Sequence, residues 1–282
     1  MADYSAQALV LKKTRLREKD LIITLLSAEG HQIRAVAKGA RRPGSRATAA
    51  VELFCVSDFL LSRGRSLDVV CEAQISCANA GCRADVEHST AASVVGELVE
   101  KLTRDAGTEK RLFALSSAAL AALGTSATEA LPLLVAATIL KIAAQTGIKP
   151  ALDQCAVCGT PLSVAAAAGF SVKQGGLLCE RCAARGPASG DAAQAAPSAA
   201  RRPVGVATSG FTSDAATLNP QLLGWLRALL FARYNEIAAS SDEIRPSRES
   251  QMALLDIALA WLEAHLGLRL VSARLLRDLF AA

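Results

Sequence analysis

Two pairs of cysteines with identical spacing constrain this sequence more than any other feature. Cys155 and Cys158 form one CxxC motif, and Cys179 and Cys182 form a second one after 20 intervening residues. Two residues between cysteines allow both sulfur atoms of one turn to face a single ion, and thiolates are ligands that zinc prefers. The spacing therefore predicts a four-cysteine zinc site that folds the surrounding segment.

The predicted zinc site is structural, because four cysteines leave no coordination position for water. The histidines of the chain, His31, His88 and His265, lie far from the cysteines in sequence. The run FSVKQGGLLC between the pairs predicts a small hairpin, with Gly175-Gly176 as its turn, that brings them together. A redox pair, unliganded thiols and an iron–sulfur cluster remain as alternatives.

The composition predicts a folded chain without a targeting segment. Its 282 residues are 51% hydrophobic, which is ample for a core. No charge-free run of about 18 apolar residues appears, and the first 20 residues carry charges where a signal peptide needs a hydrophobic run. We therefore expect a cytoplasmic protein.

The cysteines without ligand spacing are expected to be reduced: Cys55, Cys71, Cys77 and Cys82.

The N-terminal part shows the pattern of a small β-barrel. Five short apolar or alternating runs are separated by turn signals such as Glu29-Gly30 and Arg63-Gly64-Arg65. The runs are QALVLKK, DLIITLLS, HQIRAVAKG, ELFCVSDFLLSR and SLDVVCEAQIS. Five strands in about 75 residues predict an OB-fold, because closing the barrel removes exposed strand edges. We place this nucleic-acid-binding domain at residues 1–81.

From Asp85 onward the apolar residues follow a helical period, so the whole chain is predicted to be α+β. We place a helical domain at residues 82–282, with a zinc module at about 151–186 and a flexible Ala/Pro-rich linker at about 187–205. Before the zinc module, helices are expected over 85–105, 109–124 and 129–147. After the linker they are expected from Asn219-Pro220 through Ala238, from Ser247 to Leu266 before Gly267, and from Ser272 onward.

Positive charge is concentrated at the start of the chain. Residues 1–50 hold ten Lys or Arg against four acids, whereas the remainder is nearly neutral. The run KGARRPGSR, at 38–46, follows a strand that carries Arg34, and KKTRLREKD, at 12–20, is a second basic cluster. In an OB-fold such loops line the groove for nucleic acid. A solvated loop without a ligand is the competing interpretation.

Few aromatic residues accompany this basic segment. The first domain has only Tyr4, Phe54 and Phe59, and stacking on aromatic rings is what gives OB-folds their grip on bases. Binding through the phosphate backbone, with little sequence preference, is therefore expected. Motifs for ATP hydrolysis or hydrolytic catalysis are absent from the sequence, so no enzyme activity is predicted.

The order of these segments resembles the RecO family of bacterial DNA repair and recombination mediators. The resemblance is carried by ALVLKKTRLREKDLIITLLSAEGHQIRAVAKGARRPGSR, by LLVAATILKIAAQTGIKPALDQCAVCG before the second CxxC, and by the closing LRLVSARLLRDL. It implies an N-terminal OB-fold and a helical domain with an inserted zinc module. It also implies binding of single- and double-stranded DNA, and annealing of complementary strands.

The partners of the chain are implied by this resemblance alone. They are RecR, RecA indirectly, and the acidic C-terminal tail of single-strand DNA-binding protein (SSB). Lys141 is a candidate for binding the tail. The family's DNA-binding positions fall on Arg34, Lys38, Arg41, Arg42 and Arg46, with Lys12, Lys13 and Arg15 as further candidates.

Two other functions compete with the mediator. A general RNA- or single-stranded-DNA-binding OB-fold protein with a structural zinc would prefer RNA and ignore SSB. A zinc-dependent enzyme acting on nucleic acids would need an open metal site.

Overall fold

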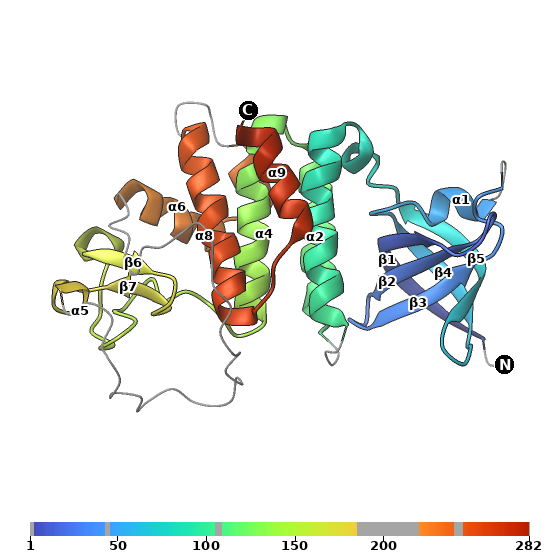
Figure 1. The fold of residues 1–282 in the computed structure, drawn as a ribbon, viewed down its shortest axis with the longest axis horizontal. Helices are drawn as coiled ribbons and strands as arrows, with labels where there is room; N and C mark the ends of the chain where they lie inside the picture. The colour runs from blue at the N-terminus through green and yellow to red at the C-terminus, as the bar shows by residue number, and fades with distance from the viewer. Residues whose placement is uncertain (1–2, 43–45, 105–108, 185–219, 240–244, 282) are drawn as a thin grey trace.

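The computed structural model describes residues 3–42, 46–104, 109–184, 220–239 and 245–281. A β-barrel, a set of packed helices and a small cysteine-containing module follow one another along its longest axis (Figure 1). The predicted α+β class with an N-terminal OB-fold is confirmed. The predicted linker at 187–205 lies outside the described residues.

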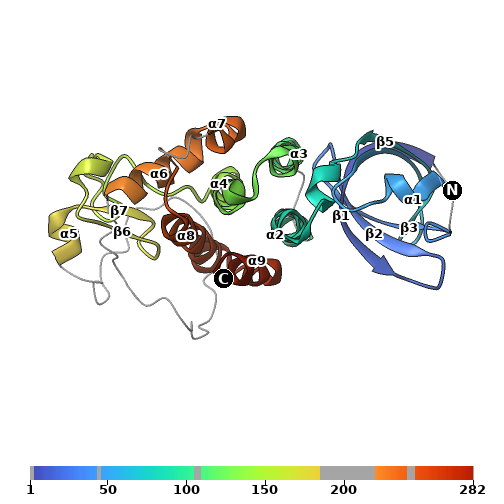
Figure 2. The same ribbon diagram turned by 90° about the horizontal axis from the view of Figure 1, so that it is seen from above.

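Five strands close into a barrel with the order β1-β2-β3-β5-β4. They are β1 (Asp3–Arg15), β2 (Leu21–Ser27), β3 (Gln32–Ala37), β4 (Val56–Ser62) and β5 (Asp68–Cys77). β1 pairs with both β2 and β4, and a short parallel pairing of β3 with β5 completes the ring. Alternate residues point inward, so Val10, Ile23, Leu25, Phe59 and Leu61 are buried together. Figure 2 shows this ring, with α1 (Arg46–Ala50) over it.

The helices pack around α4, whose sequence is apolar on all sides. The helices are α2 (Val86–Thr103), α3 (Lys110–Thr125), α4 (Leu131–Gln145), α6 (Pro220–Phe231), α7 (Tyr234–Ala238), α8 (Arg248–Leu266) and α9 (Val271–Ala281). The window Thr128–Gln145 is apolar enough to cross a bilayer by length and composition, but 72% of it is buried inside the protein. Such burial is what the core helix of a helical bundle requires.

The barrel and the helices share one apolar core. Leu9, Leu26 and Phe54 of the barrel belong to the same buried cluster as the inner faces of α2 and α4. Close approach is possible because α2 carries Gly96, where a Cβ atom would lie 3.3 Å from the carbonyl oxygen of Leu11. The predicted boundary between residues 81 and 82 falls within the short 3₁₀ helix η1 (Ala80–Arg83), which contacts both α2 and α3, and it stays a prediction.

One helix prediction needs correction. The segment from 219 to 238 was expected to be a single helix, but α6 ends at Phe231 and α7 starts at Tyr234. Arg233 between them has an extended backbone, and its N–H donates to the Glu236 carboxylate at 2.8 Å. Asn219, its expected N-cap, lies outside the described residues. The expected caps of α8 are confirmed, since the Ser247 hydroxyl accepts from Ser250 N and Gly267 adopts a left-handed conformation.

The cysteine module lies at the end of the molecule opposite the barrel (Figure 1). It contains η3 (Val164–Ala166), the two-stranded sheet β6 (Gly169–Ser171) and β7 (Gly176–Leu178), and α5 (Glu180–Ala184). The expected hairpin is present, although its turn spans residues 172–175 and Gly176 already belongs to β7. Trp261 of α8 supports the module: its ring lies 6.0 Å from that of Phe170, and its indole N–H donates to Ile148 O at 3.0 Å.

Candidate metal centre and nucleic-acid interface

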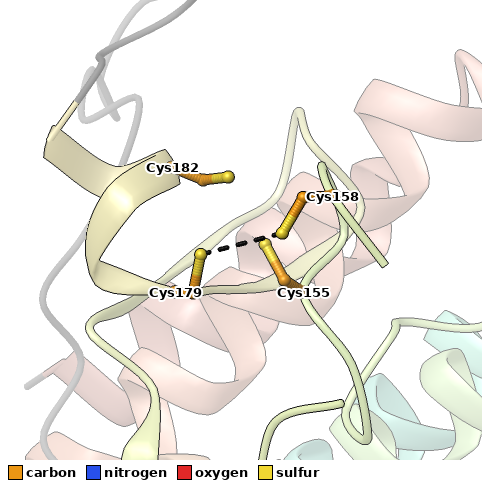
Figure 3. A group of neighbouring side chains, drawn as sticks. All are labelled: Cys155, Cys158, Cys179 and Cys182. Atoms are coloured by element: carbon orange, nitrogen blue, oxygen red, sulfur yellow. Dashed lines mark hydrogen bonds between the residues drawn. The ribbon is translucent and has the colours of Figure 1, made fainter. Parts of the chain in front are cut away.

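The two CxxC motifs meet in space. The Sγ atoms of Cys155, Cys158, Cys179 and Cys182 all lie within 4.8 Å of one another. Figure 3 shows the side chains of the two motifs directed toward a common centre, with Cys179 just before α5 and Cys182 within it. All four cysteines are free thiols rather than disulfides. The structure therefore brings together the four residues that the spacing singled out.

The local backbone explains why each pair can face one point. In the first pair, Gly159 takes a left-handed conformation (φ 71°) and its N–H donates to Cys155 O at 2.9 Å. In the second pair, Cys182 N–H donates to Cys179 O at 3.0 Å as α5 begins. Ala156 N–H donates to Leu177 O at 2.8 Å, which ties the first turn to β7. Sheet and turns thus position the sulfur atoms from opposite sides.

Two thiols of the cluster, Cys158 and Cys182, have pKa values shifted in opposite directions. Hydrogen bonds from the Thr160 hydroxyl and backbone N–H lower the pKa of the Cys158 thiol to about 6. Desolvation, followed by the neighbouring sulfur atoms, raises the pKa of Cys182 to about 12. Four negative thiolates this close repel one another unless a cation lies between them. The cluster therefore has the electrostatics of a site for a positive metal ion.

One sulfur–sulfur distance across the cluster matches the edge of a tetrahedral metal site. Cys158 Sγ and Cys179 Sγ, one from each motif, are 3.8 Å apart. A tetrahedron with metal–sulfur bonds of about 2.3 Å has edges of about 3.8 Å. The all-sulfur ligand set suits zinc or another thiophilic ion and leaves no open position for catalysis.

The other cysteines are separate from this cluster. Cys55 and Cys82 are buried, and burial raises the pKa of both thiols, that of Cys82 to about 11. Cys71 and Cys77 are exposed on β5. Within the described part of the chain, they form no metal-ligand group.

A basic surface forms where two loops of the barrel pack together. The loop after β3, residues 38–42, lies against the β1–β2 loop, residues 16–20. Arg41 Nη1 donates to Glu18 O at 2.7 Å, and Gly39 N–H donates to the Asp20 carboxylate at 2.8 Å. The carboxylate of Asp20 in the β1–β2 loop thereby holds the loop after β3 in place. We call residues 16–20 and 38–42 the basic loop pair.

Gly39 allows this arrangement. Its φ of +64° lies in the left-handed region, which side chains with a Cβ atom rarely adopt. Arg42 N–H donates back to Gly39 O at 2.9 Å, closing the turn. Lys38, Arg41 and Arg42 are all exposed.

The remaining predicted DNA-binding residues lie outside the basic loop pair. Arg34 is exposed on β3, and Arg15 is exposed at the end of β1. Lys12 and Lys13 are ion-paired, to Glu100 at 3.7 Å and to Glu52 at 2.6 Å. Arg46 is the first residue of α1, and its side chain lies outside the described part of the chain. Whether these residues bind DNA stays a prediction.

Two further cations join the basic loop pair and were not singled out from the sequence. Arg17 and Lys19 are exposed in the β1–β2 loop. The backbone carbonyl oxygen of Lys19 accepts a hydrogen bond from Arg41 N–H at 3.1 Å. Both belong to the run KKTRLREKD, so the charge was visible in the sequence. The acids in the same run made its positive charge look partly neutralised. Only the fold shows that the carboxylate of Asp20 accepts a hydrogen bond from Gly39 N–H.

Lys141, the candidate for binding the SSB tail, makes hydrogen bonds within the helical domain. Its ammonium group donates to Leu230 O at 2.9 Å and to Ala232 O at 2.8 Å, at the end of α6. Burial lowers its pKa, and the ring of Tyr234 lies 5.7 Å away. Two of its three N–H groups therefore stabilise the break between α6 and α7.

Comparison with known proteins identifies the family. A family model described as "Recombination protein O N terminal" matches residues 1–77, and one described as "Recombination protein O C terminal" matches residues 83–202. These matches cover the barrel, the first helices and the cysteine module. The chain belongs to the RecO family.

Curated relatives agree with this assignment. The chain is 34% identical over 183 residues to the DNA repair protein RecO of Desulforamulus reducens, covering 65% of this chain and 70% of the relative. It is 40% identical over 183 residues to the protein of the same name from Bifidobacterium adolescentis, with 62% and 72% covered. For that of Desulforudis audaxviator the identity is 37% over 187 residues, with 66% and 73% covered. The resemblance seen in the sequence is thus confirmed for the RecO family.

Proposed function

We propose that this RecO-family chain is a recombination mediator in DNA repair. It binds single- and double-stranded DNA, anneals complementary strands, and helps RecR to load RecA onto DNA coated with SSB. The observation that carries the proposal is the basic loop pair, where Arg41 contacts Glu18 and leaves the basic side chains of both loops exposed. Family membership supplies the biological setting.

The chemistry of this surface suits the phosphate backbone. Lys38, Arg42, Arg17 and Lys19 are exposed, and cations that replace condensed counterions on DNA gain affinity without reading bases. Concentrating two strands on one surface favours annealing, because base pairing itself supplies the driving force. No ATP and no catalytic residue are needed, so the protein acts as a non-enzymatic mediator in the cytoplasm, at the nucleoid.

We propose zinc as the ion held by Cys155, Cys158, Cys179 and Cys182. The four-sulfur ligand set, the 3.8 Å separation of Cys158 and Cys179 and the lack of a water position support a structural role. Zinc at this point would lock both CxxC turns to the β6–β7 hairpin.

The acidic tail of SSB needs an apolar surface beside a cation, and two places on the helical domain offer one. The first is Lys141, whose N–H groups are mostly used at the end of α6. The second is a pocket of about 390 Å³ where the ends of α2, α4, α8 and α9 meet. Its side chains include Pro132, Leu279 and Phe280, with Arg245 and Arg248 against Glu87 and Glu129.

We propose that the tail binds in this second pocket. Arg248 Nε donates to Phe280 O at 2.8 Å, which places a guanidinium beside an apolar wall. An Arg248→Gln variant that binds a tail peptide as well as the wild type, while Lys141→Gln does not, would move the site back to Lys141.

A general RNA-binding protein is the second candidate function, because phosphate contacts alone do not distinguish RNA from DNA. The test is to measure the affinity of the purified protein for single-stranded DNA and RNA of equal length at matched salt, and then for DNA coated with SSB. The mediator binds DNA at least as tightly as RNA and binds the SSB complex better than an SSB complex without the tail. A clear preference for RNA together with indifference to the tail would favour the second candidate.

A further inference from the structure

The barrel is closed by its shortest pairing at one seam, between β3 and β5. β3 and β5 run parallel and form only two residue pairs, Ala35 with Asp68 and Val36 with Val69. Before these pairs, β3 diverges from the β4–β5 connection, residues 63–67. A pocket of about 370 Å³ opens between them, walled by residues 31–34 of β3 and its preceding turn, by residues 63–66, and by Tyr4.

Three arginines line this pocket: Arg34 from β3, and Arg63 and Arg65 from the β4–β5 connection. All three are exposed, and within the described part of the chain none of them forms an ion pair. Three guanidinium groups around one hollow repel each other unless an anion is bound. The pocket is therefore suited to a negatively charged group.

The one carboxylate of the pocket is already engaged by the protein. Asp68 accepts from the Tyr4 hydroxyl at 2.5 Å and from Gly64 N–H at 3.0 Å. Burial, and then the hydrogen bond to Asp68, raise the pKa of Tyr4 to about 12, so its hydroxyl remains a donor at neutral pH. These hydrogen bonds fix the β4–β5 connection relative to β1. The carboxylate of Asp68 is used as their acceptor.

Tyr4 also positions one of the cations. The guanidinium of Arg63 lies over its ring, 5.3 Å from the centroid. A guanidinium held against an aromatic ring loses less conformational freedom when it binds an anion, and its planar fork matches two oxygen atoms of a phosphate. This geometry is more specific than a solvated charge at a loop tip.

The pocket and the basic loop pair lie at opposite ends of β3. Arg34, near the start of the strand, lines the pocket, and Lys38 follows the end of the strand. Four residues of extended chain span about 13 Å. A DNA strand crossing this side of the barrel could therefore contact the basic loop pair and the pocket at once.

We propose that the pocket binds a phosphate group of a DNA strand that lies along β3, with Arg34, Arg63 and Arg65 as its ligands and Tyr4 as a positioning residue. This inference rests on the proposed function and extends its DNA-binding surface to residues that the sequence assigned only to a turn. An acidic peptide adding a strand at the open seam fits less well, because only Gln32 to Arg34 of β3 are free of β5 there.

The test compares wild type with the double variant Arg63→Gln/Arg65→Gln. Fluorescence anisotropy with a single-stranded oligonucleotide, over a series of salt concentrations, gives the slope of log affinity against log salt. Loss of one phosphate contact on single-stranded DNA makes this slope shallower by about 0.7, so we expect a change of about that size. Arg63→Lys/Arg65→Lys keeps the charges and should keep most of the slope.

A matched control is Arg227→Gln/Arg274→Gln, which removes two exposed arginines from α6 and α9. It should leave the slope unchanged, and thermal unfolding should show all variants folded.

An unchanged slope in Arg63→Gln/Arg65→Gln, while substitution of Arg41 and Arg42 reduces it, would overturn phosphate binding in the pocket and leave the proposed function standing. Wild type that does not bind DNA would overturn both. Retained DNA binding with lost binding of an acidic peptide would assign the pocket to a protein partner and contradict the inference.

Discussion

Arg41 reaches across the barrel loops and donates a hydrogen bond to the backbone carbonyl oxygen of Glu18 at 2.7 Å. Two residues 23 positions apart in sequence thereby join two basic segments into one surface. The contact uses a backbone carbonyl oxygen, and within the described part of the chain Arg41 forms no ion pair, so its charge stays available to an anion. The DNA-binding proposal depends on this arrangement.

Charge reversal at Arg41 and Arg42 should weaken DNA binding. Since each phosphate contact on duplex DNA contributes about 0.9 to the salt slope, the double variant Arg41→Glu/Arg42→Glu should make the slope shallower by about 1.8. Anisotropy with a duplex at several salt concentrations measures it. Arg227→Glu/Arg274→Glu, on the helical domain, is the control for total charge. A slope equal to that of wild type would refute the assignment of these two residues.

The cysteine cluster should hold one zinc ion per chain. Elemental analysis of the purified protein should find zinc, and Cys158→Ser should lose most of it, because three sulfur ligands and a hydroxyl bind zinc more weakly. Cys71→Ser is the control, since this exposed thiol on β5 lies outside the cluster. Metal-free wild type with four reactive thiols, or visible absorption from iron and sulfide, would contradict zinc.

Glu97 of α2 caps the start of α9. Its carboxylate accepts from Val271 N at 3.0 Å, from Ser272 N at 2.9 Å and from the Ser272 hydroxyl at 2.6 Å. Burial alone would raise its pKa, but Lys101 and these donors outweigh it and lower the pKa to about 2. Because the folded pKa lies below the ordinary value of 4.5, the stabilisation is complete above pH 4.5 and is lost as the pH falls toward 2.

The substitution Glu97→Gln should therefore lower the free energy of unfolding by about 1–2 kcal/mol at pH 7, a charge-assisted contribution reduced for solvent screening. Denaturant titrations at pH 7 and pH 3 measure the difference between variant and wild type. That difference should shrink at the lower pH. A difference that stays the same at both pH values would show that the charge of Glu97 does not stabilise the helix.

Trp261 should hold the cysteine module against α8. Replacing it with Phe leaves the carbonyl oxygen of Ile148 without its donor and should cost about 1–3 kcal/mol of unfolding free energy. The zinc content should not change, because no metal ligand is altered. Trp225→Phe, at a half-buried position, should cost less, and equal losses in the two variants would contradict this role of Trp261.

Local patterns account for what could be predicted from the sequence. The alternation in QALVLKK and DLIITLLS predicts paired strands, and Ser247 and Gly267 mark the two ends of α8, because each signal acts within a few residues. The clustering of the four cysteines could also be predicted, since CxxC spacing fixes two sulfur atoms of one turn. These features need no knowledge of distant contacts.

Features that depend on distant contacts could not be predicted. The break after Phe231 is stabilised by Lys141, which lies about 90 residues earlier and binds Leu230 O and Ala232 O. The pocket at the barrel seam depends on Tyr4 meeting Asp68, 64 residues away. In the sequence, Arg63-Gly64-Arg65 is only a turn, and its role as the wall of a pocket requires the closed barrel.

We propose that the protein anneals strands through contacts with both DNA and SSB. To test this, two complementary oligonucleotides are coated with SSB, and duplex formation is followed by fluorescence, without ATP, in the presence and absence of the zinc-loaded protein. We expect the protein to accelerate duplex formation, and we expect this acceleration to be lost when the SSB tail is deleted and reduced by Arg41→Glu/Arg42→Glu. Duplex formation at the same rate with and without the folded protein would contradict it.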